Sequence, residues 1–110
     1  MACWTYILRC ADGSYYVGCT TALEQRIGRH QAGTYGGYTS TRLPVEVAWC
    51  AEFQSIYEAI AFERTLKRWS RAKKEAFIAG DWKRLMALSS RSRAEVVVLA
   101  RRPPHERYSG

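Results

Sequence analysis

Hydrophobic and polar positions divide the chain into strand-like and helix-like stretches. Residues 3–10 and 15–19 are rich in strand-forming side chains and flank the turn-forming run Ala-Asp-Gly-Ser, which predicts a hairpin. After Pro44, apolar and polar residues alternate over residues 45–53 and predict a third strand. No internal repeat is present.

The loop of the predicted hairpin decides where two tyrosines point. Tyr6 lies in the first strand and Tyr16 in the second. Residues that face each other across an antiparallel ladder share a face, so both phenols lie on one face only if the loop has an odd number of residues. A three-residue loop that pairs Cys10 with Ser14 meets this condition, and a four-residue loop does not. Packing alone explains most tyrosines in hairpins, so neither phenol by itself indicates catalysis.

Helix-start and helix-stop residues predict a first helix directly after the hairpin. Thr21 and Glu24 have the spacing of a capping box, and Gly33 can end the helix that they open. Residues 34–43 follow and are rich in glycine, tyrosine, serine and threonine. We expect them to form a surface loop.

Three more helices are predicted in the second half of the chain. Ser55 and Glu58 repeat the capping-box spacing and open a helix that reaches residue 68. Ser70 can cap a helix through residue 79 that Gly80 ends, and residues 82–88 predict a fourth helix. Beyond these, residues 95–100 are compatible with a strand or a helix end.

Length and composition limit the class of protein. The 110 residues can bury one hydrophobic core, so we expect one domain at residues 1–88 and a partly disordered C-terminal extension at residues 89–110. No basic leader precedes an apolar segment, and no apolar stretch approaches about eighteen residues, so a cytoplasmic protein is expected. The four cysteines include no Cys-x-x-Cys pair, which favours buried thiols over a zinc site or disulfides.

The charge is unevenly distributed. The formal net charge is +7, and residues 56–110 carry thirteen basic and six acidic side chains, whereas residues 1–55 carry four of each. A basic half is typical of proteins that bind a polyanion, but a solvated basic surface is an equally good interpretation of charge alone.

Glu63 occupies an unexpected position in its predicted helix. At 100° per residue it lies inside the apolar arc that contains Ala59, Phe62 and Leu66. An unpaired carboxylate there would be costly, so it should bind a cation, accept strong hydrogen bonds or line a cleft. The alternative is a structural salt bridge to an arginine such as Arg26.

Arg26 and His30 are four residues apart, so their side chains emerge on one face of the first helix. An arginine offers a planar fork of donors that suits a phosphate, and the two side chains can reach one ligand together. The alternative is a surface helix with a partly packed histidine.

These residues together resemble the GIY-YIG nuclease superfamily, which is named for two tripeptides. Trp4-Thr5-Tyr6 takes the place of the first and keeps its tyrosine, and Tyr16-Val17-Gly18 closely matches the second. Arg26 follows Tyr16 by ten residues and His30 follows it by fourteen, while Glu63 lies in the helix after the third strand. The resemblance covers residues 3–80.

Within the superfamily the chain is most similar to the small single-domain bacterial branch and to the catalytic domain of structure-specific endonuclease subunits. That likeness is carried by Gly33, Gly36-Gly37, Pro44, Phe62-Glu63 and Leu66-Lys67-Arg68. It implies an α+β fold in which three to four helices flank a three-stranded antiparallel sheet.

The resemblance also implies a chemistry. Glu63 would hold one divalent cation, Mg²⁺ or Mn²⁺, and Arg26 would bind the non-bridging phosphate oxygens. Tyr6 or Tyr16 would take a proton from the attacking water, and His30 would orient a tyrosine or relay its proton.

Nucleic-acid binding is expected from the basic run after Glu63 and from the tyrosine-rich loop. The residues are Lys67, Arg68, Arg71, Lys73, Lys74, Tyr35 and Tyr38. Trp69 either stacks on an unpaired base or belongs to the core.

We therefore expect a metal-dependent endonuclease that hydrolyses DNA, with branched or damaged structures as substrates and with a protein partner that adds specificity. Two alternatives remain open at this point. One is a nucleic-acid-binding module of the same fold with little or no cleavage activity, and the other is a protein-interaction subunit whose basic half docks an acidic partner.

Overall fold

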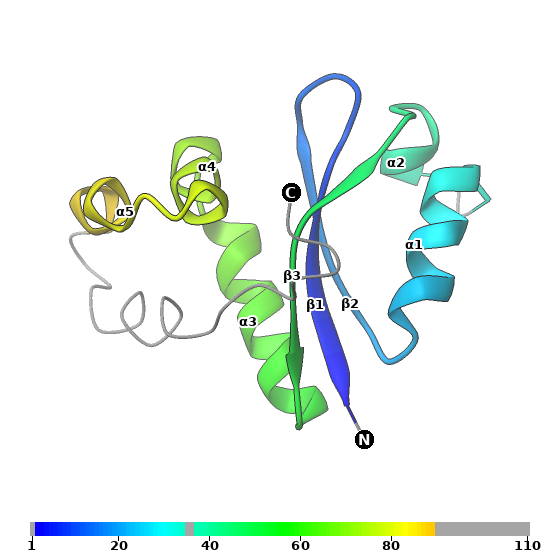
Figure 1. Cartoon of the computed structure of the whole chain (residues 1–110), viewed down its shortest axis with the longest axis horizontal. Helices are drawn as coiled ribbons and strands as arrows, with labels where there is room; N and C mark the ends of the chain where they lie inside the picture. Colours follow the sequence, from blue (N-terminus) through cyan, green and yellow to red (C-terminus); the bar gives the residue numbers. More distant parts are fainter. Residues whose placement is uncertain (1, 35–36, 90–110) are drawn as a thin grey trace.

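A three-stranded antiparallel sheet forms the centre of the protein. The computed structural model describes residues 2–34 and 37–89. Strand β1 (Cys3–Arg9) lies between β2 (Tyr15–Thr20) and β3 (Glu46–Phe53), so β2 and β3 are the two edge strands (Figure 1). The α+β class and the three-stranded sheet are confirmed.

The hairpin between β1 and β2 has the three-residue loop that places both phenols on one face. The backbone N–H of Cys10 donates to the carbonyl of Ser14 at 2.8 Å, which leaves residues 11–13 as the loop. Gly13 adopts a φ of +83°, a conformation that glycine reaches without steric cost. In this register Tyr6 pairs with Gly18, two positions from Tyr16, so of the two loop lengths that the sequence left open the structure has the one that puts both tyrosines on one face.

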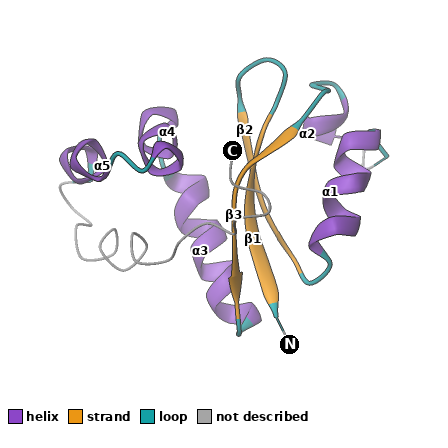
Figure 2. Ribbon diagram, in the orientation of Figure 1, coloured by secondary structure: helices purple, strands orange, loops and turns teal. Residues whose placement is uncertain are grey.

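Helices cover the two faces of the sheet. Helix α1 (Leu23–Ala32) lies on one face, and α3 (Ile56–Arg68), α4 (Arg71–Ala79) and α5 (Trp82–Leu88) lie on the other (Figures 1 and 2). Alternate residues of β1 therefore enter two separate hydrophobic clusters. Tyr6 and Leu8 pack with the α1 layer, whereas Ile7 packs with the α3 layer.

Aromatic side chains fill the core of the α3 layer. Phe77 contacts Trp49, Phe62 and Trp69 with ring centroids 4.9, 6.1 and 5.6 Å apart. Trp69 is only 8% exposed, so the core interpretation of this residue is confirmed and the base-stacking one is wrong for this conformation.

The capping residues of α3 and α4 are those that the sequence predicts. The Ser55 hydroxyl accepts the N–H of Tyr57 at the start of α3, and the Ser70 hydroxyl accepts the N–H of Lys73 at the start of α4. Gly80 ends α4 in the left-handed conformation.

The predicted capping box at the start of α1 is wrong. The residue before the helix is Ala22, which has no side-chain hydrogen bond to the helix. The Thr20 hydroxyl instead accepts the N–H of Ala22 at 3.1 Å. Two adjacent threonines precede this helix, and the strand that ends at Thr20 determines which of them binds the backbone.

The predicted surface loop after α1 contains a fifth helix, α2 (Gly37–Ser40), among the described residues. Thr39 in this helix is buried, so the expectation of a wholly exposed loop is wrong. The four residues are too few to produce a helical period in the sequence.

Tyr35 lies outside the described residues, as do residues 90–110, which include most of the expected C-terminal extension and the whole 95–100 segment. Within the described part of the chain, no helix has the length and apolar character to cross a membrane.

Candidate active site

Two tyrosines, a histidine and a threonine form one connected group in the α1 layer. The Tyr6 hydroxyl and Nε2 of His30 are hydrogen-bonded at 3.0 Å, and Nδ1 of His30 and Oγ1 of Thr39 at 2.9 Å. The ring centroid of Tyr16 lies 5.1 Å from that of His30 and 6.4 Å from that of Tyr6. Tyr6, His30 and Thr39 are 0, 3 and 2% exposed, whereas Tyr16 is half-buried. Tyr16 is therefore the phenol of this group that a ligand can reach.

Gly18 makes room for the phenol of Tyr6. A Cβ atom on Gly18 would lie 2.5 Å from the Tyr6 hydroxyl oxygen and 2.7 Å from Cζ of the same ring. Non-bonded heavy atoms do not approach so closely, so any side chain at residue 18 would displace the buried phenol. The glycine that ends the second tripeptide is thus required by packing.

Helix α1 places Arg26 beside this group. Leu23, Ile27 and His30 form the buried side of the helix, and Arg26 is half-buried at the margin of that side. Burial lowers the pKa of His30 below its ordinary value of 6.5, and the positive charge of Arg26 lowers it further. The neutral imidazole is consequently favoured, and it can both donate and accept a proton.

Glu63 is not part of the phenol and imidazole group. It lies on α3, on the opposite face of the sheet from α1 (Figure 1). Its side chain is 17% exposed and forms an ion pair of 3.2 Å with Nζ of Lys67. Cys19 on β2 lies next to this carboxylate, and burial together with Glu63 raises the pKa of the Cys19 thiol to about 12. The partners of Glu63 shown here are thus Lys67 and Cys19, and not the Arg26 that the structural alternative suggested.

Edge strand β2 separates Glu63 from the phenols. Tyr16 and Cys19 are three residues apart on this strand, and their side chains belong to opposite layers. At a rise of about 3.3 Å per residue, their Cα atoms are about 10 Å apart along the strand. Tyr16 and the Cys19 neighbour of Glu63 therefore lie on opposite faces of the edge strand β2.

Comparison with known proteins identifies this arrangement. A family model described as the GIY-YIG catalytic domain matches residues 2–76. The chain belongs to the GIY-YIG family. The match begins at β1 and ends within α4, so it includes both tripeptides, Arg26, His30 and Glu63.

Relatives of this GIY-YIG domain are similar in sequence to about two thirds of the chain or more. A UPF0213 protein of Streptococcus pneumoniae serotype 4 is 42% identical over 76 residues, which cover 69% of this chain and 77% of the relative. A UPF0213 protein of Natronomonas pharaonis is 41% identical over 78 residues, which cover 71% of this chain and 92% of the relative. These two names state no activity, metal or substrate.

Two solved structures share the GIY-YIG fold of this chain. The solution NMR structure of the UPF0213 protein BH0048 from Bacillus halodurans is 37% identical with a TM-score of 0.50, and covers 81% of this chain and 98% of that one. The NMR structure of EF2693 from E. faecalis is 35% identical with a TM-score of 0.51, and covers 72% of this chain and 84% of that one.

The basic residues of this GIY-YIG domain have different environments. Arg68 is exposed at the end of α3, and Arg71 pairs with Glu75 at 2.8 Å. Nζ of Lys73 lies 4.4 Å from the ring centroid of Trp69, and burial lowers the pKa of Lys74. Lys67 is exposed although it pairs with Glu63.

Tyr38 is exposed beside the phenol group but already has ring contacts. The Tyr38 ring stacks on that of Tyr16 with the two centroids 6.2 Å apart. The guanidinium of Arg42 lies 3.8 Å from the centroid of the Tyr38 ring. A base that stacked on Tyr38 would compete with at least one of these contacts.

Sequence reasoning missed three residues of the site. Thr39 was hidden in a polar segment without periodicity, and Cys19 looked like an ordinary strand residue. Thr5 replaces an apolar motif residue, yet it is fully buried and its hydroxyl donates to the carbonyl of Ala59 at 2.9 Å, which joins β1 to α3. The contacts of Thr5 and Cys19 join elements that are distant in the sequence, and Thr39, although only nine residues from His30, lies in a segment with no helical period that would place it.

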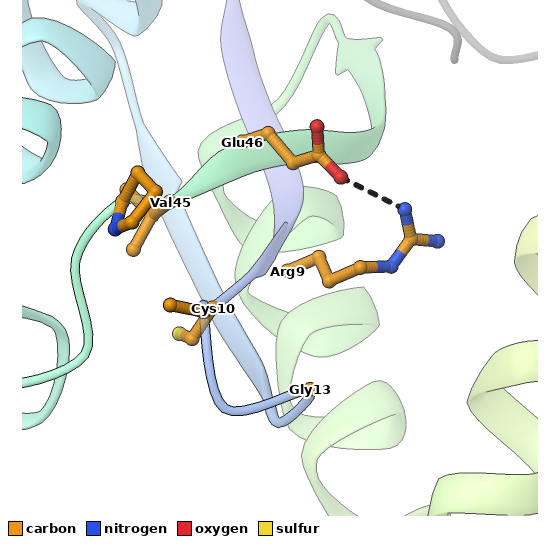
Figure 3. Close-up of a pocket in the computed structure, with 7 residues that line it drawn as sticks. Arg9, Cys10, Gly13, Val45 and Glu46 are labelled. Carbon is orange, nitrogen blue, oxygen red and sulfur yellow. Dashed lines mark hydrogen bonds and ion pairs between the residues drawn. The ribbon is translucent and has the colours of Figure 1, made fainter.

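A separate pocket of about 380 Å³ lies near the hairpin loop. Arg9 and Glu46 meet on its wall in an ion pair of 3.0 Å, and Cys10, Gly13 and Val45 also line it (Figure 3). No tripeptide tyrosine and none of the predicted charged site residues lines this pocket. We do not assign the pocket to the candidate active site.

Proposed function

We propose that this domain is a metal-dependent endonuclease that hydrolyses phosphodiester bonds in DNA, with branched or damaged structures as its substrates. The observation that carries the proposal is the half-buried Tyr16, which packs against the neutral His30 at the edge of the sheet. The arrangement places a reachable phenol against a buried imidazole that can hold it in position, and membership of the GIY-YIG family supports nuclease chemistry.

Glu63 is the proposed metal ligand. Within residues 2–34 and 37–89, no three histidine, cysteine, aspartate or glutamate side chains gather as a metal-binding group. Mg²⁺ commonly uses only one or two carboxylates and completes its shell with water and substrate phosphate, so a single partly exposed Glu63 fits this ion better than it fits zinc. When bound, the cation would stabilise negative charge on the leaving oxygen.

The side chains of the chain perform the remaining steps in this proposal. Arg26 binds the non-bridging oxygens of the scissile phosphate and offsets their charge in the transition state. Tyr16, after its hydroxyl proton has passed to solvent, accepts the proton of the attacking water as a phenolate, and His30 orients its ring. Tyr6 has no exposed surface, so of the two candidate bases Tyr16 is the one that we assign.

Exposed basic residues beyond the site would hold the DNA backbone. Lys67, Arg68 and Arg71 lie at the junction of α3 and α4, which follows Glu63 directly in the chain. Such contacts with phosphates are insensitive to sequence, which suits recognition of DNA shape. A protein partner that supplies further specificity remains part of the proposal.

A cleavage panel tests the proposed function. Labelled single-stranded, duplex, flapped and four-way DNA would be incubated with the protein in Mg²⁺ or in EDTA, beside Glu63→Gln, Arg26→Ala and Tyr16→Phe variants. We expect Mg²⁺-dependent cutting of a branched substrate, loss of cutting in all three variants, and retained DNA binding by Glu63→Gln. Unchanged cutting by Glu63→Gln would contradict the assigned metal ligand.

A second candidate is a nucleic-acid-binding module that does not cut. It is favoured by one observation, the ion pair that already engages the carboxylate of Glu63 on the face opposite the phenols. DNA binding without metal-dependent cutting of any substrate in the panel would support this candidate over the nuclease. Absence of salt-sensitive binding to any of the DNAs would contradict both and leave an interaction subunit as the explanation.

A further inference from the structure

Thr39 is a buried polar residue whose role the proposed chemistry does not explain. It lies on α2, which packs against α1, and its side chain is almost fully enclosed. Its hydroxyl oxygen lies 2.9 Å from Nδ1 of His30. A buried hydroxyl generally requires such a partner, but this partner is the imidazole that contacts both motif tyrosines.

Both ring nitrogens of His30 are engaged, and this restricts its protonation. A neutral imidazole carries one N–H donor and one acceptor nitrogen, and the environment of His30 favours the neutral form. Two arrangements are consistent with the distances to Tyr6 and Thr39. Either the phenol donates to Nε2 and Nδ1–H donates to the threonine, or the threonine donates to Nδ1 and Nε2–H donates to the phenol oxygen.

The relative strengths of the donors favour the first arrangement. A phenol is a much stronger acid than an aliphatic hydroxyl, and an unprotonated imidazole nitrogen is a stronger acceptor than a phenol oxygen. Pairing the Tyr6 hydroxyl with the unprotonated Nε2 therefore gives the strongest hydrogen bond that this buried group can form. The proton of the imidazole then resides on Nδ1, where the oxygen of Thr39 accepts it.

We propose that Thr39 is a positioning residue that accepts the Nδ1–H of His30, and so fixes the tautomer and the orientation of the ring that lies between Tyr6 and Tyr16. The structural part of this inference concerns only Thr39, His30 and Tyr6. Its catalytic consequence rests on the proposed function, because it requires Tyr16 to act as the base. A fixed imidazole holds the half-buried Tyr16 ring in one orientation.

The tautomer can be measured directly. Long-range ¹H–¹⁵N correlation spectra of the ¹⁵N-labelled protein distinguish a protonated from an unprotonated ring nitrogen, and a His30→Gln variant identifies the signals of His30. We expect Nδ1–H in the wild type and in Thr39→Ser, which keeps the hydroxyl. In Thr39→Val, which has a similar shape but no hydroxyl, we expect a shift of the population toward Nε2–H.

A wild-type spectrum with the proton on Nε2 would overturn the proposal, even if Thr39→Val did not fold. An unchanged tautomer in a folded Thr39→Val protein would overturn it as well. These outcomes need no nuclease activity, so they are independent of the proposed function.

Kinetics of the full chain give the second readout. On the substrate identified by the cleavage panel, we expect Thr39→Val to lower kcat by about 10- to 100-fold with little change in KM, as for loss of a hydrogen-bond partner that orients a catalytic imidazole. Thr39→Ser should restore most of kcat. Equal losses in both variants, with the tautomer preserved, would contradict the catalytic consequence of the proposal.

Discussion

The hydroxyl of Tyr6 lies so close to Gly18 that a Cβ atom on the glycine would stand 2.5 Å from it. The phenol is completely buried and is bonded to His30, so it has little freedom to move away. This contact links the two tripeptides of the motif through packing.

Gly18→Ala should therefore destabilise the domain. We expect the free energy of unfolding to fall by about 1–3 kcal/mol, the usual cost of an overpacked core, measured by urea denaturation. Gly28→Ala is the matched control, because Gly28 is an exposed residue within α1 and a Cβ there meets nothing within 4 Å. That variant should be about 0.5–1 kcal/mol more stable than the wild type. Equal effects of the two substitutions would show that residue 18 has room for a side chain.

The buried His30 should make folding stability dependent on pH. Because its pKa is lowered in the folded state, the unfolded chain binds more protons once the pH falls below about 6.5, and the free energy of unfolding should then decrease. The contribution of His30 is fully present above pH 6.5 and is lost as the pH falls through its folded-state pKa. Urea denaturation at several pH values between 7 and 5 gives the free energy of unfolding at each pH. This free energy should fall more steeply with decreasing pH in the wild type than in His30→Gln. The pKa of Asp12 is lowered as well, but this affects the free energy of unfolding only below the ordinary Asp value of 3.8, outside the pH range of the experiment. Superimposable slopes would argue against a buried neutral imidazole.

Removing Lys67 should strengthen metal binding at Glu63. The Nζ atom of Lys67 occupies the carboxylate at 3.2 Å and competes with a cation. An ion pair at this helical spacing is worth about 0.3–0.5 kcal/mol, so Lys67→Met should lower the half-saturating Mg²⁺ concentration about twofold, measured by isothermal titration. Lys83→Met, on the exposed surface of α5, removes the same charge elsewhere and should have no effect. An increased Mg²⁺ requirement in Lys67→Met alone would mean that the lysine assists the metal site.

The salt dependence of DNA binding should identify the phosphate contacts. Each basic residue that contacts a phosphate adds about one unit to the slope of log affinity against log salt concentration, so Arg68→Ala should reduce the slope by about one. Arg84→Ala, at an exposed position on α5, should leave it unchanged. Fluorescence anisotropy at several salt concentrations measures the slope for each variant. A reduction for Arg84→Ala but not for Arg68→Ala would move the DNA-binding surface from α3 to α5.

Local patterns predicted most elements of the fold. Ser55, Ser70 and Gly80 act over a few neighbouring residues, and the structure confirms each of them, whereas it decides the hairpin loop length that the sequence left open. Helix α2 could not be predicted, because four residues have no measurable period and packing against α1 stabilises them. The choice of Thr20 over Thr21 likewise depends on where β2 ends.

The candidate site was predictable only in part. Spacing within α1 placed Arg26 and His30 on one side of the helix, as expected, whereas the sequence left open the loop length that decides whether Tyr6 lies beside Tyr16. The side of the sheet on which Glu63 lies depends on how α3 crosses from β3, which no local pattern encodes. Its contact with Cys19 and the contact of Thr39 with His30 are tertiary for the same reason.

The complete enclosure of Tyr6 bears on how relatives of this protein are interpreted. A tyrosine that stabilises the interior is favoured in a folded homologue whether or not that homologue is a nuclease. Its retention in a genome sequence therefore says little about activity. If the proposed function holds, loss of the outer phenol, of the guanidinium on the first helix or of the carboxylate across the strand would mark a homologue without catalysis.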